Sequence, residues 1–504
     1  MIRAWGFIAA AIIMSSVIAP LSLTGEQVRE IKRQVRLEVA RRAAKAGDVL
    51  LWGKMLMPSK FPLPFCELHD YLVATRKDAF TSTEAPRGHA KTTIGCTLLP
   101  LYQGLVEPQA YRHYLNVQSN ADKALTINRA IKMEIEQNPL IRALYGDQMG
   151  ERWTDACFVL KNGVVYSAEG YGASIRGLNY RGIRPDWVSN DDFYDTESDT
   201  NNPNGTLKKN DWFWGTLFPI LAQDRKTAMH LRGTAVNRED LFEKLKSDDT
   251  VKSKTFKAII DWEKKAVLWK GLKTFEQFEQ MRMRMGTVIF SREFQNERRD
   301  DASSIIKMSW LYPDDGSRNW EYDPSTLRFD EHYAYQAGVV TLDPSIGSKN
   351  HSDKSGYALV IRAQRDDGSL PQFYIEAVAN ELHSFQQRID AVKAYTKNRP
   401  AERPVTRVRV ETISGFKDIG DRIAASVSVP CDLVDHVANK QTVLEKKSAV
   451  FENKRVFLNQ NISPALKTEL AYQLTTNMPK NDDLRDAVFL GLDEAEVDWS
   501  ASYG

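Results

Sequence analysis

Short apolar runs alternate with longer amphipathic segments along most of the chain. Such alternation is typical of an α/β fold, in which strands and helices follow one another. In the first half of the chain the pattern predicts a series of strands with helices between them. The predicted strands lie at residues 78–83, 114–120, 156–160, 164–168, 184–192 and 228–232, and the predicted helices begin near residues 93, 121 and 237.

The pattern changes twice in the rest of the chain. Residues 246–285 are charged and aromatic and are predicted to be helical, and the Pro, Asp and Ser clusters of residues 297–329 predict a linker. Strands then begin again, at residues 337–343, 355–361, 372–378 and 406–411, with helices over 384–398 and from 481 onward. We therefore expect a helical region over residues 26–58 and two α/β domains, over 59–296 and 330–504.

Length and composition agree with this division. The chain has 504 residues, too many for one ordinary core, so two or three domains are expected. The net charge of +2 is nearly balanced, so a nucleic-acid partner would have to bind a local basic patch. The four cysteines, Cys66, Cys96, Cys157 and Cys431, lack C-x-x-C spacing. This argues against structural zinc and a disulfide framework and is typical of a reducing compartment.

The first 25 residues do not fit that compartment. No charged residue occurs between Ala4 and Gly25, and the stretch alone resembles a signal peptide or a membrane anchor. The charge-rich amphipathic helix predicted after it is instead typical of a cytosolic protein. Three interpretations remain open: a start codon assigned too far upstream, a membrane anchor, or an apolar helix packed on the body of the protein.

Residues 84–93, with the sequence EAPRGHAKTT, have the composition of a phosphate-binding loop between a strand and a helix. At such a turn, backbone N–H groups at the helix start face the phosphates, a Lys neutralises them and a Thr hydroxyl can bind Mg²⁺. Lys91 and Thr92 supply these groups. Ala85 and Ala90 stand where the pattern G-x-x-x-x-G-K-[ST] has glycines. The segment is therefore either a deviant P-loop or an ordinary strand-to-helix turn.

Asp191 and Asp192 follow a predicted strand later in the chain. A P-loop ATPase needs one carboxylate to hold Mg²⁺ and another to polarise the attacking water. Alone, such a pair is more often a solvated turn, but the P-loop-like segment before it favours the catalytic interpretation. Thr234, at the end of a further predicted strand, would sense the γ-phosphate or would belong to a capped loop.

The C-terminal half has acids at the ends of predicted strands, Asp343 and Glu411, and on a late helix, Asp482, Asp483 and Asp486. These are the parts of an RNase H-like nuclease, in which carboxylates hold two Mg²⁺ ions about 3.5–4 Å apart. Without metal such carboxylates repel one another, so a purely structural cluster would be costly. Ordinary strand-end acids are the alternative explanation.

Together these segments resemble the large terminase subunit of tailed bacteriophages, a DNA-packaging protein with an ATPase and a nuclease in one chain. The resemblance covers about residues 60 to 495. The matching stretches are APRGxxKT at 85–92, SIRG at 174–177, RPD at 184–186, DD at 191–192, GT at 233–234, DL at 240–241, FSREFQN at 290–296, Asp343, Glu411 and DDxxDA at 482–487. The family more often has Asp-Glu at 191–192, so the division of roles between these two residues stays open.

The resemblance implies a role for each matching residue. ATP phosphates would be bound by Arg87, Gly88, His89, Ala90, Lys91, Thr92 and Thr93. Thr92 and Asp191 would hold Mg²⁺, Asp192 would be the catalytic carboxylate, Arg87 would contact the γ-phosphate and Thr234 would couple hydrolysis to movement. The nuclease metals, Mg²⁺ or Mn²⁺, would be held by Asp343, Glu411 and Asp486, with Asp483 the next candidate for the third position.

The resemblance also implies a fold, partners and a location. A P-loop NTPase domain, with a mostly parallel sheet flanked by helices, would be followed by an RNase H-like α/β nuclease domain. The expected partners are double-stranded DNA, a small terminase subunit and the portal protein of the procapsid. We expect a monomer in solution, a homo-oligomeric ring on the portal, and a location in the host bacterial cytoplasm. The gene could derive from a prophage.

Two other functions remain open. The chain could be a helicase-like or repair ATPase whose C-terminal domain only binds nucleic acid, or a membrane-anchored ATPase. DNA contacts of a motor that slides on any sequence should be basic residues bound to backbone phosphates. Lys417, Arg422 and Arg485 flank the proposed nuclease acids in the sequence and are candidates for such contacts.

Overall fold

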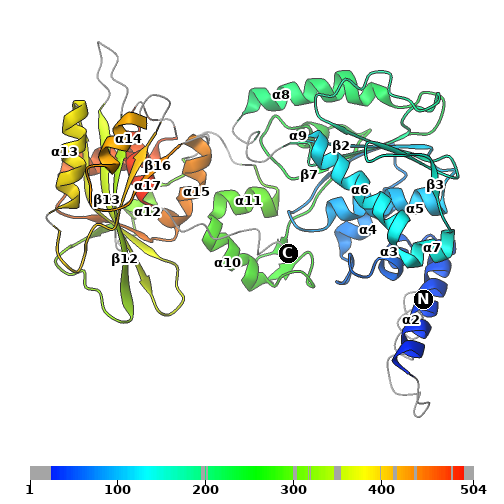
Figure 1. Ribbon diagram of the computed structural model, residues 1–504, viewed down its shortest axis with the longest axis horizontal. Coiled ribbons are helices and arrows are strands. Elements are labelled where there is room, and N and C mark those ends of the chain that lie inside the picture. Colours follow the sequence, from blue (N-terminus) through cyan, green and yellow to red (C-terminus); the bar gives the residue numbers. More distant parts are fainter. Residues whose placement is uncertain are drawn as a thin grey trace.

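The computed structural model consists of two α/β bodies, with helices α10 (Phe275–Met285) and α11 (Thr287–Gln295) between them (Figure 1). It describes residues 24–194, 199, 202–298, 304–315, 317, 319–344, 354–397, 399–412, 417–435, 440–477, 479 and 481–492. The apolar stretch at the start of the chain lies outside these ranges, so its three interpretations stay open. Within these ranges no helix is long and apolar enough to cross a membrane.

The N-terminal body is built on an eight-stranded sheet in the order β3-β4-β5-β2-β6-β7-β1-β8. Six strands are parallel, and two antiparallel strands form one edge. The parallel strands are β1 (Phe80–Glu84), β2 (His113–Gln118), β5 (Val165–Gly170), β6 (Trp187–Asp191), β7 (Ala228–Gly233) and β8 (Lys252–Thr255); the edge strands are β3 (Met149–Trp153) and β4 (Cys157–Leu160). Every residue of β2, β6 and β7 is buried, as expected for a parallel sheet covered by helices on both faces.

The order of the central strands decides where the site lies. In the register of this sheet Glu84 of β1 pairs with Gly233 of β7, and Arg232 of β7 pairs with Asp191 of β6. The loops that follow β1, β6 and β7 therefore leave the sheet side by side at its carboxyl edge. Ligands of open α/β sheets bind at this edge.

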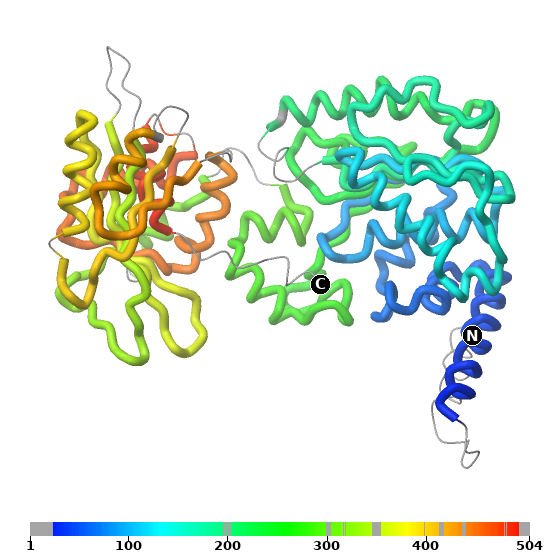
Figure 2. Tube along the Cα trace, in the orientation of Figure 1, coloured from blue at the N-terminus to red at the C-terminus, as the bar shows by residue number. Residues whose placement is uncertain are grey.

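Helices cover this sheet and extend it toward the N-terminus. The helix that follows the loop after β1 begins at Lys91 and continues as π-helix η1 (Thr93–Leu98) into α5 (Leu99–Val106). The others are α2 (Gly25–Ala46), α3 (Val49–Leu56), α4 (Glu67–Ala74), α6 (Ala121–Gln137), α7 (Pro139–Tyr145), α8 (Pro203–Trp212) and α9 (Leu241–Leu245). The start of α2 projects away from the body (Figure 2).

The prediction of a helix over residues 246–285 is wrong for its first part. Residues 252–255 form β8 at the edge of the sheet, β9 (Ile259–Asp261) and β10 (Ala266–Val267) form a separate antiparallel pair, and the helix begins only at Phe275. Lysines at an edge strand discourage pairing with another chain. In the sequence these charged residues look like those on the solvent-exposed face of a helix.

The C-terminal body has a seven-stranded sheet in the order β11-β17-β14-β13-β12-β15-β16. Its strands are β11 (Glu321–Tyr322), β12 (Tyr333–Asp343), β13 (Ser355–Arg365), β14 (Gln372–Glu381), β15 (Arg407–Glu411), β16 (Cys431–Val434) and β17 (Val456–Asn459). The first three long strands form an antiparallel meander, and β15 and β16 lie parallel to β12 on its other side. This arrangement confirms the predicted RNase H-like fold.

Helices cover both faces of this second sheet. On one face, α13 (Phe385–Thr396) and α14 (Lys417–Ala424) share a core with β12 and β15. On the other face lie α15 (Lys440–Glu452), α16 (Pro464–Thr475) and α17 (Asp483–Gly491), together with the short helix α12 (Met308–Leu311). Residues 305, 306, 311 and 320, in the segment expected to be a linker, are buried in this core. Compact structure therefore begins before residue 330.

The two bodies meet where α10 and α11 pack on α15 (Figure 1). The Arg292 guanidinium lies 2.8 Å from the Glu445 carboxylate, and the Thr287 backbone N–H donates to Glu452 at 2.8 Å. At Gly286 a Cβ would lie 3.1 Å from Ala449, so the glycine permits this close approach. The contact therefore combines a nearly buried ion pair with close packing of α15 against the backbone at Gly286.

Candidate active sites

The turn after β1 has the backbone of a phosphate-binding loop. Gly88 and Ala90 both have left-handed conformations, with φ of 74° and 55°. Left-handed residues that alternate with right-handed ones turn successive N–H groups into one concavity that can hold an anion. Glycine adopts this backbone freely, whereas alanine does so at a cost of about 1–2 kcal/mol. The alanine that departs from the strict motif therefore occupies the backbone conformation for which glycine would be favoured.

Replacing Ala90 by glycine should stabilise the protein. We expect the free energy of unfolding to rise by about 0.5–1 kcal/mol, because relief of the left-handed strain outweighs the entropy that glycine gains in the unfolded chain. Ala85→Gly is the matched control at the other motif position, where φ is not positive and glycine should destabilise. Urea unfolding of the two variants measures both effects, and destabilisation of similar size in both would contradict the assignment.

Lys91 is the cation of this site. Its side chain is buried, and its ammonium lies 3.4 Å from both an Asp192 carboxylate oxygen and the Thr234 hydroxyl. Burial lowers the pKa of Lys91, but the nearby charges of Asp192 and Asp191 raise it more, so the pKa ends above its usual value. The ammonium therefore stays charged and is available to an anion. The structure thus brings together Lys91, Asp191, Asp192 and Thr234, which the sequence predicted from three separate segments.

Asp191 and Thr92 form a second contact beside this lysine. The Thr92 hydroxyl donates a short hydrogen bond to one Asp191 carboxylate oxygen, and the other oxygen is buried without a hydrogen-bond partner among the described residues. Burial and the Asp192 charge raise the pKa of Asp191 to about 6, against the opposing effects of Lys91 and Thr92. The Thr92 hydroxyl and the Asp191 oxygen that lacks a hydrogen-bond partner are suitable ligands for Mg²⁺, because Mg²⁺ prefers oxygen ligands.

Glu293 on α11 belongs to the site although the sequence analysis did not single it out. Its backbone carbonyl accepts from the Arg87 N–H at 3.0 Å, and its carboxylate lies 3.4 Å from the Arg87 guanidinium. Arg292 lies 3.2 Å from the same carboxylate. Glu293 therefore holds the exposed Arg87 side chain at the mouth of the loop. It lies in the FSREFQN stretch, but no spacing rule indicated its partner.

The His89 side chain does not face the phosphate side of the loop. It is fully buried, stacks on Phe278 with ring centroids 6.1 Å apart, and makes a 3.0 Å hydrogen bond to the Arg87 carbonyl. Burial lowers its pKa to about 4. From α4, the His69 ring makes a 3.1 Å hydrogen bond to the His89 carbonyl. The neutral His69 and His89 rings hydrogen-bond to the loop backbone from the protein interior. Only the backbone of His89 is therefore left for phosphate binding.

The second group of acids lies at one edge of the C-terminal sheet. Asp343 ends β12 and Glu411 ends the neighbouring parallel strand β15, so both are delivered to the same place. The helix α17 brings Asp483 and Asp486 to this edge. It can approach because Gly356 has no side chain: a Cβ there would lie 2.1 Å from the Asp483 carbonyl oxygen.

Asp343 is the most strongly perturbed of these acids. It is buried, and its carboxyl shares a hydrogen bond with Glu411. Burial raises its pKa well above the usual value, and Glu411, Asp486 and Asp483 raise it further. Like charges this close disfavour the ionised form of one another, so Asp343 resists ionisation in the metal-free protein.

Two basic residues lie among the acids of α17. The Lys440 ammonium lies 2.7 Å from Asp482 and 2.8 Å from Asp486, and the Arg485 guanidinium lies 3.0 Å and 3.2 Å from the same two residues. Arg485 is almost fully buried. The prediction that it contacts DNA is therefore wrong, because its charge is used inside the protein. Arg422 is exposed, 3.7 Å from Asp418, and the Lys417 side chain lies outside the described residues.

In the described part of the chain, no three His, Cys, Asp or Glu side chains already converge on one metal-sized point. Lys440 and Arg485 instead form ion pairs with Asp486 on α17. The oxygen-rich set formed by Asp343, Glu411 and the acids of α17 still has the chemistry that Mg²⁺ and Mn²⁺ require. These residues therefore fit such ions by donor type, with Lys440 as the competing cation.

The raised pKa of Asp343 predicts a pH dependence of stability in the presence of a chelator. An acid whose pKa is higher in the folded than in the unfolded protein stabilises the fold below the unfolded value, near 4, and this stabilisation is lost as pH rises through the folded value. The free energy of unfolding should therefore fall with rising pH more steeply for the wild type than for Asp343→Asn. Urea titrations between about pH 4 and pH 8 measure both slopes; equal slopes would mean that Asp343 does not bind the extra proton.

Comparison with known proteins adds a structural similarity. No protein family and no curated protein sequence matches the chain. Among solved structures, the large terminase of bacteriophage HK97 is 14% identical over 85% of this chain and 95% of its own, with a TM-score of 0.36. The ATPase domain of the Thermus phage P74-26 large terminase is 10% identical over 49% and 98%, with a TM-score of 0.33, and the human cytomegalovirus terminase nuclease domain is 15% identical over 39% and 98%, with a TM-score of 0.28.

All three are terminases. Solved terminase structures are thus among the structures to which this chain is similar. At these identities and TM-scores the likeness concerns the fold. Roles for individual residues have to come from the two sites of this chain.

Proposed function

We propose that this protein is a large terminase subunit, which uses ATP hydrolysis to move double-stranded DNA into procapsids and cuts concatemeric DNA with a metal-dependent nuclease. One observation carries the proposal: a single chain has a phosphate loop with its acids at one sheet edge and a separate cluster of acids on an RNase H-like sheet. The phosphate-loop group is Lys91, Thr92, Asp191 and Asp192, and the nuclease group is Asp343, Glu411 and Asp486. A helicase or repair ATPase needs only the first group.

In the ATPase half, the loop from Arg87 to Thr93 would bind the phosphates through its backbone N–H groups. The Lys91 ammonium would neutralise their charge and would stabilise it further as it grows in the transition state. Asp192, half exposed beside Lys91, would accept a hydrogen bond from the attacking water and orient it. Thr92 and Asp191 would hold Mg²⁺, which when bound neutralises charge on the β- and γ-phosphates.

In the nuclease half, Asp343, Glu411 and Asp486 would hold the metal ions, with Asp483 as the alternative for the third position. Bound ions of this kind supply Lewis acidity and activate water for attack on a phosphodiester. The protein's own task is to release these carboxylates. Asp343, whose pKa is raised, must ionise, and Asp486 must exchange the Lys440 ammonium for the metal.

The proposed partners follow from the proposed reaction. They are double-stranded DNA, a small terminase subunit and a portal protein, with a ring of copies forming on the portal. A motor of this kind must bind DNA of any sequence, so its contacts should be mainly to backbone phosphates. The proposed site of action is the cytoplasm of the bacterial host.

ATP hydrolysis by the full-length protein with different nucleic acids tests this function against the helicase-like alternative. Duplexes of unrelated sequence should stimulate hydrolysis equally, and the stimulation should fall as salt rises, because phosphate contacts release counterions. A separate assay should find no unwinding of the duplex. Stimulation only by single strands, with ATP-dependent strand separation, would contradict the packaging function and support a helicase.

A further inference from the structure

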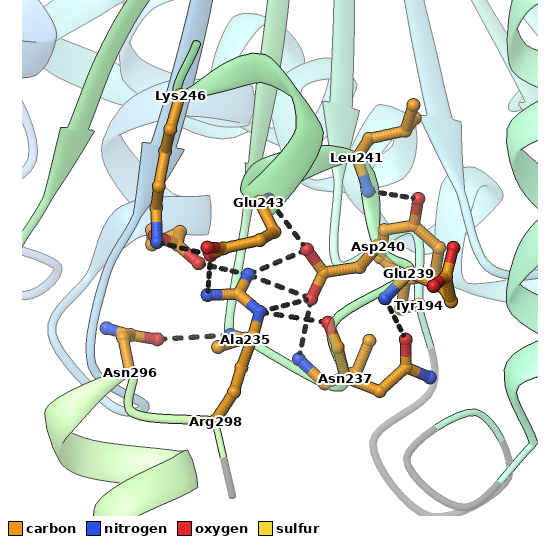
Figure 3. Close-up of polar contacts among 12 residues, drawn as sticks. Tyr194, Ala235, Asn237, Glu239, Asp240, Leu241, Glu243, Lys246, Asn296 and Arg298 are labelled. Atoms are coloured by element: carbon orange, nitrogen blue, oxygen red, sulfur yellow. Dashed lines mark hydrogen bonds and ion pairs between the residues drawn. The ribbon is translucent and has the colours of Figure 1, made fainter. Parts of the chain in front are cut away.

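Arg298 binds three carboxylates at the carboxyl edge of the N-terminal sheet (Figure 3). Its guanidinium lies 2.5 Å from Glu84, 2.6 Å from Asp240 and 3.0 Å from Glu243. The side chains of Arg298, Glu84 and Asp240 are 6%, 2% and 0% exposed. Lys246 is a second cation, 3.1 Å from Glu84 and 2.8 Å from Glu243. The cluster therefore has three acids and two bases, most of them out of contact with water.

Arg298 is the only base of the cluster within ion-pair distance of Asp240 among the described residues. Burial raises the pKa of Asp240 above its usual value, although Arg298 opposes this change. Removing one partner of such a buried pair leaves an uncompensated charge, which is strongly destabilising. Any test of a special role for Arg298 must therefore separate that role from a general loss of stability.

The residues that Arg298 binds belong to the proposed ATPase machinery. Glu84 is the last residue of β1, directly before the phosphate loop. Asp240 closes the loop over residues 234–240 by accepting hydrogen bonds from the Val236 N–H at 3.0 Å and the Glu243 N–H at 2.9 Å. Arg298 also donates to the Asn237 carbonyl of this loop at 2.9 Å. One guanidinium thus joins the end of β1 to the loop that begins with Thr234.

The neighbouring residue Asn296 holds the same loop at its other end. Its side-chain oxygen accepts from the Ala235 N–H at 3.1 Å (Figure 3), and its amide group donates to the Phe256 carbonyl at 2.8 Å. On the opposite side, the Ala85 N–H donates to the Gly233 carbonyl at 2.9 Å. The position of Thr234, 3.4 Å from Lys91, is therefore fixed by the phosphate loop on one side and by residues 296–298 on the other.

We propose that Arg298 is a positioning residue of the ATPase site, which holds the 234–240 loop against the end of β1 and so keeps Thr234 beside Lys91. This role rests on the ATPase function proposed above. Arg298 also lies at the end of the described N-terminal body, directly before the connection to the C-terminal body, whose description resumes at residue 304.

The test is the Arg298→Met variant of the full-length chain, which keeps the length of the side chain and removes its charge and donors. We expect kcat for ATP hydrolysis to fall on the order of 10- to 100-fold, as for a misplacement of about 1 Å, with KM changed less than about threefold. Hydrogen exchange of residues 234–240 should accelerate in the nucleotide-free protein. Arg403→Met is the matched control, because Arg403 is also buried and binds Glu376 at 3.1 Å in the other body; it should leave kcat and this exchange unchanged.

A second variant separates positioning from stability. Arg298→Met combined with Asp240→Asn keeps the net charge of the cluster, and asparagine can still cap α9. We expect this double variant to regain most of the thermal stability lost in the single variant while kcat stays low. Recovery of both stability and kcat would overturn the proposal, because Arg298 would then act only as a buried counter-ion.

The exchange measurement stays decisive whether or not the protein hydrolyses ATP. If the wild type is inactive, the proposed ATPase function fails. Faster exchange of residues 234–240 in Arg298→Met would still show that Arg298 stabilises the conformation of this loop. Unchanged exchange in that variant would overturn the proposal at any level of activity. Normal kcat despite faster exchange would also overturn it.

Discussion

Replacing Lys91 by alanine should abolish ATP hydrolysis and leave DNA cleavage intact. The variant removes the only ammonium that the described structure places within reach of Asp192 and Thr234, so the charge that grows on the phosphates during transfer loses the stabilisation that Lys91 would give. We expect kcat/KM for ATP to fall by about 10²–10³-fold or more. Phosphate release measures hydrolysis, and nicking of supercoiled plasmid measures cleavage, because the nuclease acids lie on the other sheet.

Lys132→Ala is the control for this variant. Lys132 also pairs with an acid, Asp155, at 2.6 Å, but lies on α6 away from the phosphate loop, so its removal should leave both activities unchanged. The Lys91 variant must also be shown to be folded, since Asp191 and Asp192 lose their counter-ion. If a folded Lys91→Ala protein lost plasmid cleavage as well, the two sites would not be independent.

Asp343→Ala should have the opposite effect. Plasmid cleavage should fall by at least about 10²-fold, while ATP hydrolysis remains at the wild-type rate. Without metal the variant should be no less stable than the wild type, because it removes a carboxyl whose pKa is raised by burial and by the neighbouring acids. The rise in melting temperature that Mn²⁺ causes in the wild type should shrink or disappear, because one metal ligand is missing.

Asp366→Ala is the matched control for the nuclease site. Asp366 lies just beyond the far end of β13 and pairs with His332 at 2.6 Å, so its loss should change neither cleavage nor the effect of Mn²⁺. Unchanged cleavage by Asp343→Ala would remove that residue from the site. Equal cleavage by the two variants would leave the cluster of acids without a function.

The sequence predicted most of the fold because hydrophobic periodicity marks long buried strands. The acids at the ends of β6, β12 and β15 could be found for the same reason: a strand that ends in a carboxylate delivers it to the edge of a sheet. Adjacent strands then bring together residues far apart in the chain, such as Lys91 and Thr234. Local patterns cannot show such a neighbour, but they can show that each strand has a polar end.

What the sequence could not predict depends on packing between segments. Glu293 and Arg298 lie on or after α11 and contact the phosphate loop and β1, respectively; nothing in their spacing indicates these partners. Arg485 looks like a surface charge in the sequence, but α17 turns it into the core beside Asp482 and Asp486. Lys440 reaches the same acids from α15. For residues with long charged side chains, the sequence thus gives the least information about burial and contact partners.

The β-strands within residues 246–285 show a different limit. These strands are only two to four residues long, and β8 contains two lysines, so the sequence shows no clear alternation. Residues 252–255 form β8 because they pair in parallel with β1. Such pairing depends on the partner strand more than on the intrinsic strand preference of the residues themselves. The helical prediction was correct only where the amphipathic pattern is long, in α10.

The central claim is that one chain has two metal-dependent activities at two sites, and one preparation of the full-length wild-type protein can test it directly. ATP hydrolysis and cleavage of supercoiled plasmid should be measured together over a range of Mg²⁺ and Mn²⁺ concentrations. If the protein has both sites, both activities should occur, both should vanish with a chelator, and each should return with metal. Hydrolysis without any cleavage at every metal concentration would contradict it.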